Sequence, residues 1–136
     1  CSSVALFKLL EGATIAQSLT DALPFAGAVL KPLLEQALAM PKLDSAAVAE
    51  CFGPSCHLTE GLPVIFHIAQ HTPHYRAAIE ANIRIGGDSC GRSIMLGAMA
   101  ATRAAIENPS EFAIPLSWLA SYRKFAAAAD ACATIE

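Results

Sequence analysis

Histidine and cysteine side chains at close spacing are the first residues in this sequence that could do chemistry. His67 and His71 lie four positions apart, so on a helix they would share one face, a spacing that can hold a metal ion. The glutamate that follows the first histidine in zinc protease motifs is absent, because an isoleucine stands there. On paper, Cys51, Cys56 and His57 could complete a zinc site. We interpret the histidine pair as helix-surface and interface residues, with a zinc site as the alternative.

Cys56 and His57 form an adjacent pair that could also supply a nucleophile. A Cys–His nucleophile requires the imidazole to take the proton of the thiol. Side chains of neighbouring residues rarely point at each other. We therefore expect a buried cysteine and a capping histidine, with a catalytic dyad as the alternative.

A run over residues 82–93 contains the strongest turn signal of the chain. Two adjacent glycines end one predicted helix, and Asp88 stands at the start of the next. The first turn of a helix attracts anions, and an acid there can face a bound cation. The plain alternative is a helix–turn–helix corner that Asp88 caps.

The elements that must position these residues are predicted to be helices. Alanine, leucine and isoleucine dominate, and sustained alternating strand patterns are absent. Pro32 should kink or divide the second helix, and Asp44 or Ser45 should cap the third. Asn108 and Pro109 should end the helix that starts near residue 89. The apolar spacing predicts helices over about 2–20, 24–40, 44–50, 62–70, 75–85, 89–107 and 116–129.

Composition limits the class of protein. The 136 residues allow one domain or part of one, and 54% hydrophobic against 15% charged residues excludes disorder. A net charge of −3 gives no electrostatic footprint for nucleic acid. No apolar stretch is long enough for a transmembrane segment. Five scattered cysteines do not resemble a disulfide framework, so a reducing intracellular compartment is favoured, although the compartment stays open.

The run GGDSCGRSIMLGAMAATRAAIEN, with Ile114-Pro115 and Trp118 after it, resembles the C-terminal signature of the ADP-ribosylglycohydrolase family. The resemblance is clearest over residues 57–125. It implies an all-α, orthogonal multi-helix fold. It also implies a pair of magnesium ions that helps to hydrolyse the N- or O-glycosidic bond of ADP-ribose.

The sequence departs from that signature at the positions that supply metal ligands. Asp88 matches the first aspartate, but Cys90 replaces the second, Gly91 replaces the last threonine, and Ser89 replaces the threonine between them. A thiol is a poor ligand for a hard cation, and glycine offers no side-chain oxygen. We therefore expect a degenerate magnesium site that has lost its cofactor, with Asp88 as the one residue carried over as a candidate metal ligand.

The altered positions suggest two further hypotheses, one about an altered site and one about a branch of the family. Cys90 at a helix start can have a lowered pKa, and Arg92 can face a phosphate or carboxylate. The Ser89-Cys90 form, together with Cys56 and His57 upstream, resembles a divergent branch of the family that includes jellyfish J-crystallins and selenoprotein J.

The acidic motifs of the family's N-terminal half are absent from these residues, and the sequence starts at Cys1 without methionine. We therefore expect the C-terminal half of a family domain, from a processed or longer chain. Its apolar surplus should be covered by the missing half or by another protein chain. The first functional hypothesis is a divergent ADP-ribosylglycohydrolase-like protein that is not catalytic as this chain. The alternative is a non-catalytic helical structural or accessory subunit of a larger assembly.

Overall fold

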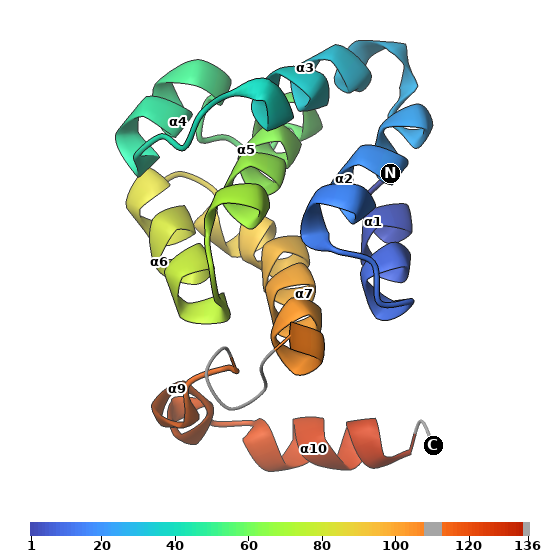
Figure 1. Ribbon diagram of the computed structural model, residues 1–136. Coiled ribbons are helices and arrows are strands. Elements are labelled where there is room, and N and C mark those ends of the chain that lie inside the picture. Colours follow the sequence, from blue (N-terminus) through green and yellow to red (C-terminus); the bar gives the residue numbers. More distant parts are fainter. Residues whose placement is uncertain (108–112, 135–136) are drawn as a thin grey trace.

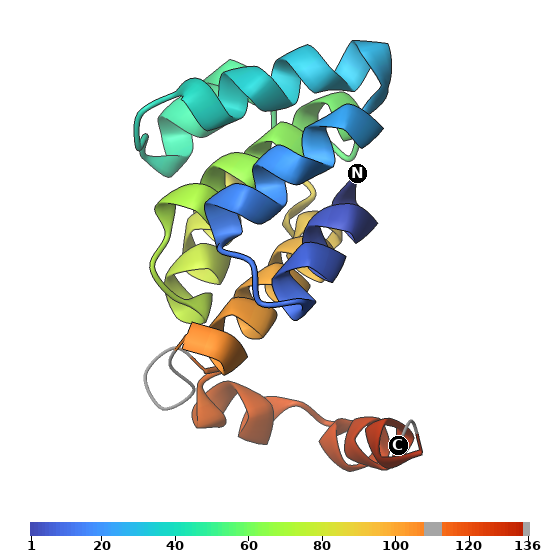
Figure 2. The ribbon, with the colours of Figure 1, turned by 45° about the vertical axis from the view of Figure 1, so that its right-hand side comes forward.

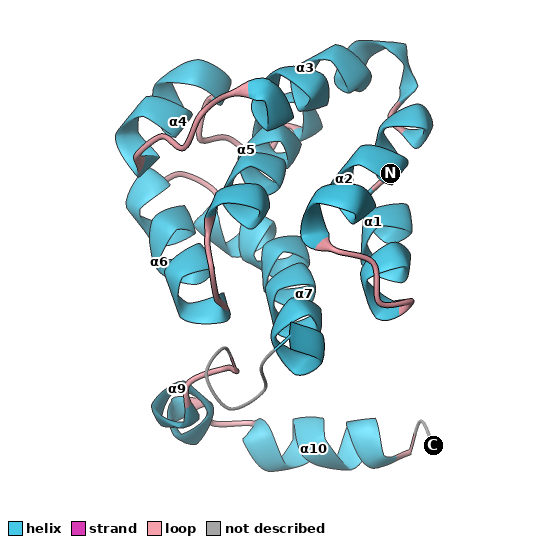
Figure 3. Ribbon diagram, in the orientation of Figure 1, coloured by secondary structure: helices cyan, strands magenta, loops and turns pink. Residues whose placement is uncertain are grey.

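The computed structural model describes residues 1–107 and 113–134, and these form helices without strands (Figures 1 and 3). The predicted all-α class is therefore confirmed. The helices are α1 (Ser2–Leu10), α2 (Ile15–Ala22), the short 3-10 helix η1 (Leu23–Phe25), α3 (Gly27–Ala39), α4 (Ser45–Phe52), α5 (Leu58–His71), α6 (Tyr75–Ile85), α7 (Ser89–Glu107), α9 (Leu116–Ser121) and α10 (Phe125–Ala133).

Helix α5 is the centre of the fold. Residues 61–69 are all buried, and the helix packs against α2, α3, α4, α6 and α7. A helix that is apolar on every side must be surrounded by other helices. Pro63 lies in its second turn, so α5 begins at Leu58, earlier than the predicted start at residue 62. This early start places the 53–57 loop directly before a buried helix.

The prediction of one helix over residues 2–20 is wrong. Helix α1 ends at Leu10, and Gly12 then takes a φ of +89°, which a helix cannot contain. Thr14 starts α2 through a capping box with Gln17, in which each side chain binds the backbone amide of the other residue. Leu19 and Leu9 can thus both reach the core from two separate helices that pack together.

The second predicted helix is divided at Gly27 rather than at Pro32. Gly27 has a φ of +74° and separates η1 from α3, whereas α3 continues through Pro32 to Ala39. The third predicted helix is confirmed as α4, and its cap is Asp44, whose Oδ1 accepts the amide proton of Ala47 at 2.9 Å.

The C-terminal prediction of one helix over 116–129 is also wrong, because α9 and α10 are separate. Trp118 attaches α9 to α6: its ring lies 6.2 Å from that of Tyr75, edge to face, and 5.8 Å from the guanidinium of Arg76. Figures 1 and 2 show α10 standing away from the other helices. The helix stop expected at Asn108 and Pro109 lies outside the described residues. Within the described ranges, no helix combines the length and apolarity needed to cross a membrane.

Candidate functional site

The corner between α6 and α7 is where the glycine pair of the sequence lies. Gly86 and Gly87 have φ values of +75° and +58°, so the chain reverses through conformations that favour glycine. A side chain on Gly87 would overlap the carbonyl of Pro54, and the amide of Asp88 donates to that same carbonyl at 2.9 Å. The corner therefore docks closely against the 53–57 loop.

Asp88 caps α7. Its Oδ1 accepts the backbone proton of Gly91 at 3.0 Å, as expected of an N-cap residue. A Cβ on Gly91 would overlap the Asp88 carboxylate, so the carboxylate occupies the space that a side chain at position 91 would need. The two residues are thus fitted to each other.

Arg92 is buried beneath this cap, with 2% of its surface exposed. Its Nε donates to Asn82 Oδ1 at 2.7 Å, its Nη1 to the carbonyl of Pro54 at 2.8 Å, and its Nη2 to that of Gly86 at 2.6 Å. Burial lowers the pKa of Arg92, and the negative charge of Asp88 opposes that shift. The guanidinium N–H groups of Arg92, which could have faced a phosphate, instead donate to the 53–57 loop and to the corner between α6 and α7.

Asn82 completes this buried polar cluster, and it was not singled out from the sequence as a site residue. Its Nδ2 donates to the carbonyl of Ser89 and to Ser93 Oγ, each at 2.8 Å. The available signal was its position on the apolar face of α6, where an amide must find partners when it is buried. Asn82 therefore positions both Arg92 and the first turn of α7.

Residues predicted from distant parts of the sequence share one cleft of about 230 Å³. Cys56 and His57 line it from the loop before α5, and Asp88 and Arg92 line it from α7. Cys56 is exposed, contrary to the expectation of a buried cysteine. His57 is the N-cap residue of α5 but makes no capping hydrogen bond with its side chain. The remaining lining residues are Ser2, Ser55, Leu58, Gly61, Leu62, Ile65, Gly91 and Met95.

Ser89 and Cys90 are not among the lining residues of this cleft. The side-chain amide of Asn82 donates to the carbonyl of Ser89, and Cys90 is exposed in the first turn of α7. No hydrogen bond joins the thiol of Cys56 to the ring of His57 in the described part of the chain. No hydrogen bond in that part of the chain therefore supports the alternative of a catalytic dyad.

Glu60 is a carboxylate beside the cleft that the sequence analysis missed. Its Oε2 accepts the amide proton of Ser55 at 3.1 Å, and a side chain on Gly53, at a φ of +88°, would overlap the carboxylate. Hydrogen bonds from the side chain and the backbone of Ser55 lower the pKa of Glu60, and the charge of His57 adds to this. Glu60 thus holds the 53–57 loop in its turn.

The predicted histidine pair lies elsewhere and binds backbone. Buried His67 accepts the amide proton of Leu43 on Nε2 at 3.3 Å, so its proton is on Nδ1, which faces the carbonyl of Ala37 at 3.2 Å. His71 Nε2 lies 3.1 Å from the carbonyl of Met40. Desolvation lowers the pKa of His67. Over residues 1–107 and 113–134 no group of three or more His, Cys, Asp or Glu could hold a metal ion.

Comparison with known proteins identifies the family. The family model described as ADP-ribosylglycohydrolase matches residues 1–135, which is nearly the whole chain. Neither the curated proteins nor the solved structures gave a match. The family match and the all-helical fold agree with the signature around Asp88. The chain belongs to the ADP-ribosylglycohydrolase family.

Proposed function

We propose that this chain is a divergent ADP-ribosylglycohydrolase-like protein with a degenerate magnesium site, and that it does not hydrolyse ADP-ribosyl bonds by itself. The observation that carries the proposal is the contact between Asp88 and Gly91. The carboxylate at the first ligand position caps its own helix, in space left open by a glycine at the last ligand position.

The donor set does not fit magnesium. Mg²⁺ requires near-octahedral oxygen coordination at about 2.0–2.1 Å, and it keeps waters only where carboxylates anchor it. Asp88 is the sole carboxylate among the residues that line the cleft. Cys90, at the second ligand position of the family signature, does not line the cleft and offers only sulfur, which is too soft for this ion, and Gly91 offers no side-chain atom. A single carboxylate that is already used as a helix cap cannot anchor a pair of magnesium ions.

The charge of Arg92 also opposes a divalent cation. Its guanidinium is buried, lines the same cleft as Asp88 and interacts electrostatically with that carboxylate. Like charges repel more strongly where water is excluded. A magnesium ion beside Asp88 would meet a fixed positive charge that the protein holds with three short hydrogen bonds.

Thermal unfolding with and without Mg²⁺ and ADP-ribose tests this proposal. A ligand at one hundred times its Kd adds about 2.7 kcal/mol to the free energy of unfolding, which moves the Tm by several degrees. We expect no shift at 10 mM Mg²⁺, and no release of ADP-ribose from an ADP-ribosylated peptide. The matched variant Cys90→Asp tests whether an added carboxylate restores a shift. Magnesium-dependent hydrolysis by the unaltered chain would refute the proposal.

A structural or accessory role is the second candidate, and exposed apolar side chains favour it. Ile94 on α7 is 79% exposed and Leu58 on α5 is 72% exposed. We propose that they belong to one apolar patch, because contiguous patches, unlike single exposed residues, mark surfaces that other proteins or domains cover. The partner is the N-terminal half of the family domain or another protein chain. The Ser89-Cys90 form supports a place in the divergent branch that includes jellyfish J-crystallins and selenoprotein J.

Light scattering distinguishes this role from that of an isolated module. We expect the chain to self-associate at high concentration through its apolar surface, and Ile94→Glu to reduce the association. The matched variant Ser3→Glu adds the same charge at another exposed position and should leave association unchanged. A chain that stays monomeric at every concentration would contradict self-association through this apolar surface.

A further inference from the structure

We propose that a second cleft, between α4, α5 and α6, binds a small organic monocarboxylate with an apolar body. The cleft has a volume of about 500 Å³ and shares no lining residue with the Asp88 cleft. Small-molecule sites commonly measure about 300–1,000 Å³ and combine apolar walls with a few charged groups. This cleft has both features.

The inner wall of the cleft is apolar and rigid. Val48 of α4, Ile68 of α5 and Ile85 of α6 are 1%, 4% and 8% exposed, and each lines the cleft from a different helix. Ala77 and Ala81 add methyl groups from α6. The three buried side chains form the floor behind the cleft, and the partly exposed methyl groups of Ala77 and Ala81 are the surface that an aliphatic or aromatic ligand would contact.

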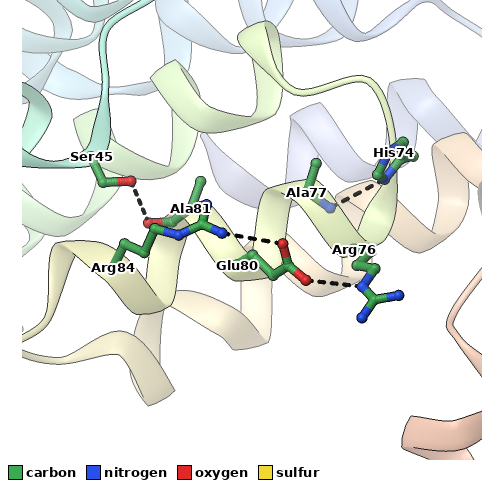
Figure 4. A network of polar contacts seen from close by, with 7 residues as sticks. All are labelled: Ser45, His74, Arg76, Ala77, Glu80, Ala81 and Arg84. Atoms are coloured by element: carbon green, nitrogen blue, oxygen red, sulfur yellow. Dashed lines mark hydrogen bonds and ion pairs between the residues drawn. The ribbon is translucent and has the colours of Figure 1, made fainter.

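The rim of the cleft carries two cationic side chains, Lys42 and Arg84, and one carboxylate, Asp44. Lys42 makes no ion pair or hydrogen bond in the described part of the chain. Arg84 binds Glu80 Oε2 at 3.4 Å, while Oε1 of the same carboxylate binds Arg76 at 2.9 Å (Figure 4). One carboxylate therefore serves two guanidinium groups, and both lie with it along α6.

The other polar groups facing the cleft are already occupied. The carboxylate of Asp44 caps α4, and Ser45 Oγ donates to the carbonyl of Ala81 at 2.8 Å, which ties α4 to α6 (Figure 4). His67 is neutral with both ring nitrogens bound to backbone, and His71 faces the carbonyl of Met40. Asp44 keeps its negative charge as a cap and opposes an anion, so the attraction rests on the two cationic side chains Lys42 and Arg84 outnumbering this one carboxylate in the lining.

A titration of the ¹⁵N-labelled chain with octanoate, followed by NMR, tests the proposal. We expect saturable shifts of the amides of Leu43, Ala46, Ala81 and Arg84. Acetate lacks the apolar body and should bind at least about 30-fold more weakly, since each buried methylene contributes about fourfold. Octanol lacks the charge and should bind about 2- to 10-fold more weakly.

Variants separate charge from shape. Lys42→Gln and Arg84→Gln should each weaken octanoate binding about 1.5- to 5-fold. The matched control Lys31→Gln removes a lysine that pairs with Glu35 on α3, outside the cleft, and should leave binding unchanged. Ala81→Leu and Ala77→Leu keep every charge but fill the cleft, so each should abolish the shifts in a chain whose spectrum stays dispersed.

Three results would overturn the proposal. The first is shifts that remain linear up to 50 mM octanoate, about the limit for a useful site. The second is octanol binding as tightly as octanoate, which would leave only an apolar surface. The third is an equal loss of affinity in Lys31→Gln, which would mean a general effect of charge rather than this cleft.

Discussion

Asp88 and Gly91 share one small volume at the start of α7. The carboxylate of Asp88 accepts the amide proton of Gly91 at 3.0 Å and fills the space where a Cβ at position 91 would lie. The cap and the missing side chain therefore depend on each other. At the two ends of a sequence run that resembles a metal-ligand signature, the contacts found are those of a helix cap.

This dependence predicts a non-additive double mutant. Alanine stabilises a helix by about 1 kcal/mol relative to glycine, and loss of an N-cap costs about 1 kcal/mol. Gly91→Ala should therefore change the free energy of unfolding little on its own, because it displaces Asp88. In the Asp88→Ala background the same change should stabilise by about 1 kcal/mol. Urea unfolding of the four proteins measures the coupling.

The control for this cycle is Asp44→Ala, which removes the cap of α4. It should destabilise by about 1 kcal/mol in either background at position 91. If Gly91→Ala gave the same stabilisation with and without Asp88, the two residues would not be coupled.

Arg92 should be among the most sensitive positions for stability. Arg92→Met leaves the carbonyls of Pro54 and Gly86 and the amide oxygen of Asn82 without a donor, and each unpaired buried group costs about 1–3 kcal/mol. We expect a loss of at least about 3 kcal/mol in urea unfolding. Arg92→Lys should restore little, because one ammonium cannot reproduce the planar fork.

The exposed Arg84 provides the comparison, since Arg84→Met should change the free energy of unfolding by less than about 0.5 kcal/mol. If Arg84→Met and Arg92→Met lowered the free energy of unfolding equally, the buried hydrogen bonds of Arg92 would make no measurable contribution to stability.

Because His67 is buried, we expect the chain to lose stability at mildly acid pH. Burial lowers its folded pKa below the ordinary value of 6.5, so below that pH the unfolded chain binds a proton that the folded chain does not. Its contribution is complete above pH 6.5 and is lost as the pH falls through that value toward the folded pKa. The slope should not exceed about 1.4 kcal/mol per pH unit.

His67→Gln should remove this slope between pH 7 and 5.5 in urea unfolding, whereas the exposed His57→Gln should keep it. The lowered pKa values of Glu60 and Glu80 act in a different window, below their ordinary value of 4.5. A slope unchanged in His67→Gln would assign the acid sensitivity to another group.

Trp118 should determine how firmly α9 is attached. Its ring contacts Tyr75 and Arg76, so Trp118→Ala should release α9 from α6. Trypsin should then cut faster after Arg123 and Lys124, which follow α9. Trp118→Phe keeps an aromatic ring and should be cut at nearly the original rate. Loss of the whole fold in Trp118→Ala, seen by circular dichroism, would contradict a local role.

Local signals in the sequence determined the helices that begin or end at a proline, a glycine or an N-cap residue. Helix α6 is predicted with its observed bounds, Tyr75–Ile85, because Pro73 precedes it and Gly86 ends it. The cap of α4 by Asp44 and the cap of α7 by Asp88 are likewise local, since an N-cap side chain binds an amide three residues ahead. The family signature could be read from the order of such elements.

Breaks inside continuous apolar periodicity were missed, because the apolar spacing outweighed the local signals at Gly12 and Thr14. The spacing of leucine and alanine continues from α1 into α2, and only the positive φ of Gly12 and the cap at Thr14 end the helix. Pro32 was a stronger sequence signal than Gly27, but the chain turns at the glycine. Several helix boundaries satisfy the same pattern, and the packing of the helices against one another selects among them.

Only the tertiary structure decided what the candidate residues contact. Arg92 is buried because the 53–57 loop closes over it, and its partner Pro54 is 38 residues away in the chain. Cys56 and His57 meet Asp88 in one cleft for the same reason. The amino acid type determines which charges and donors are available. Burial and partners depend on which distant segments pack together, and that is a property of the whole core.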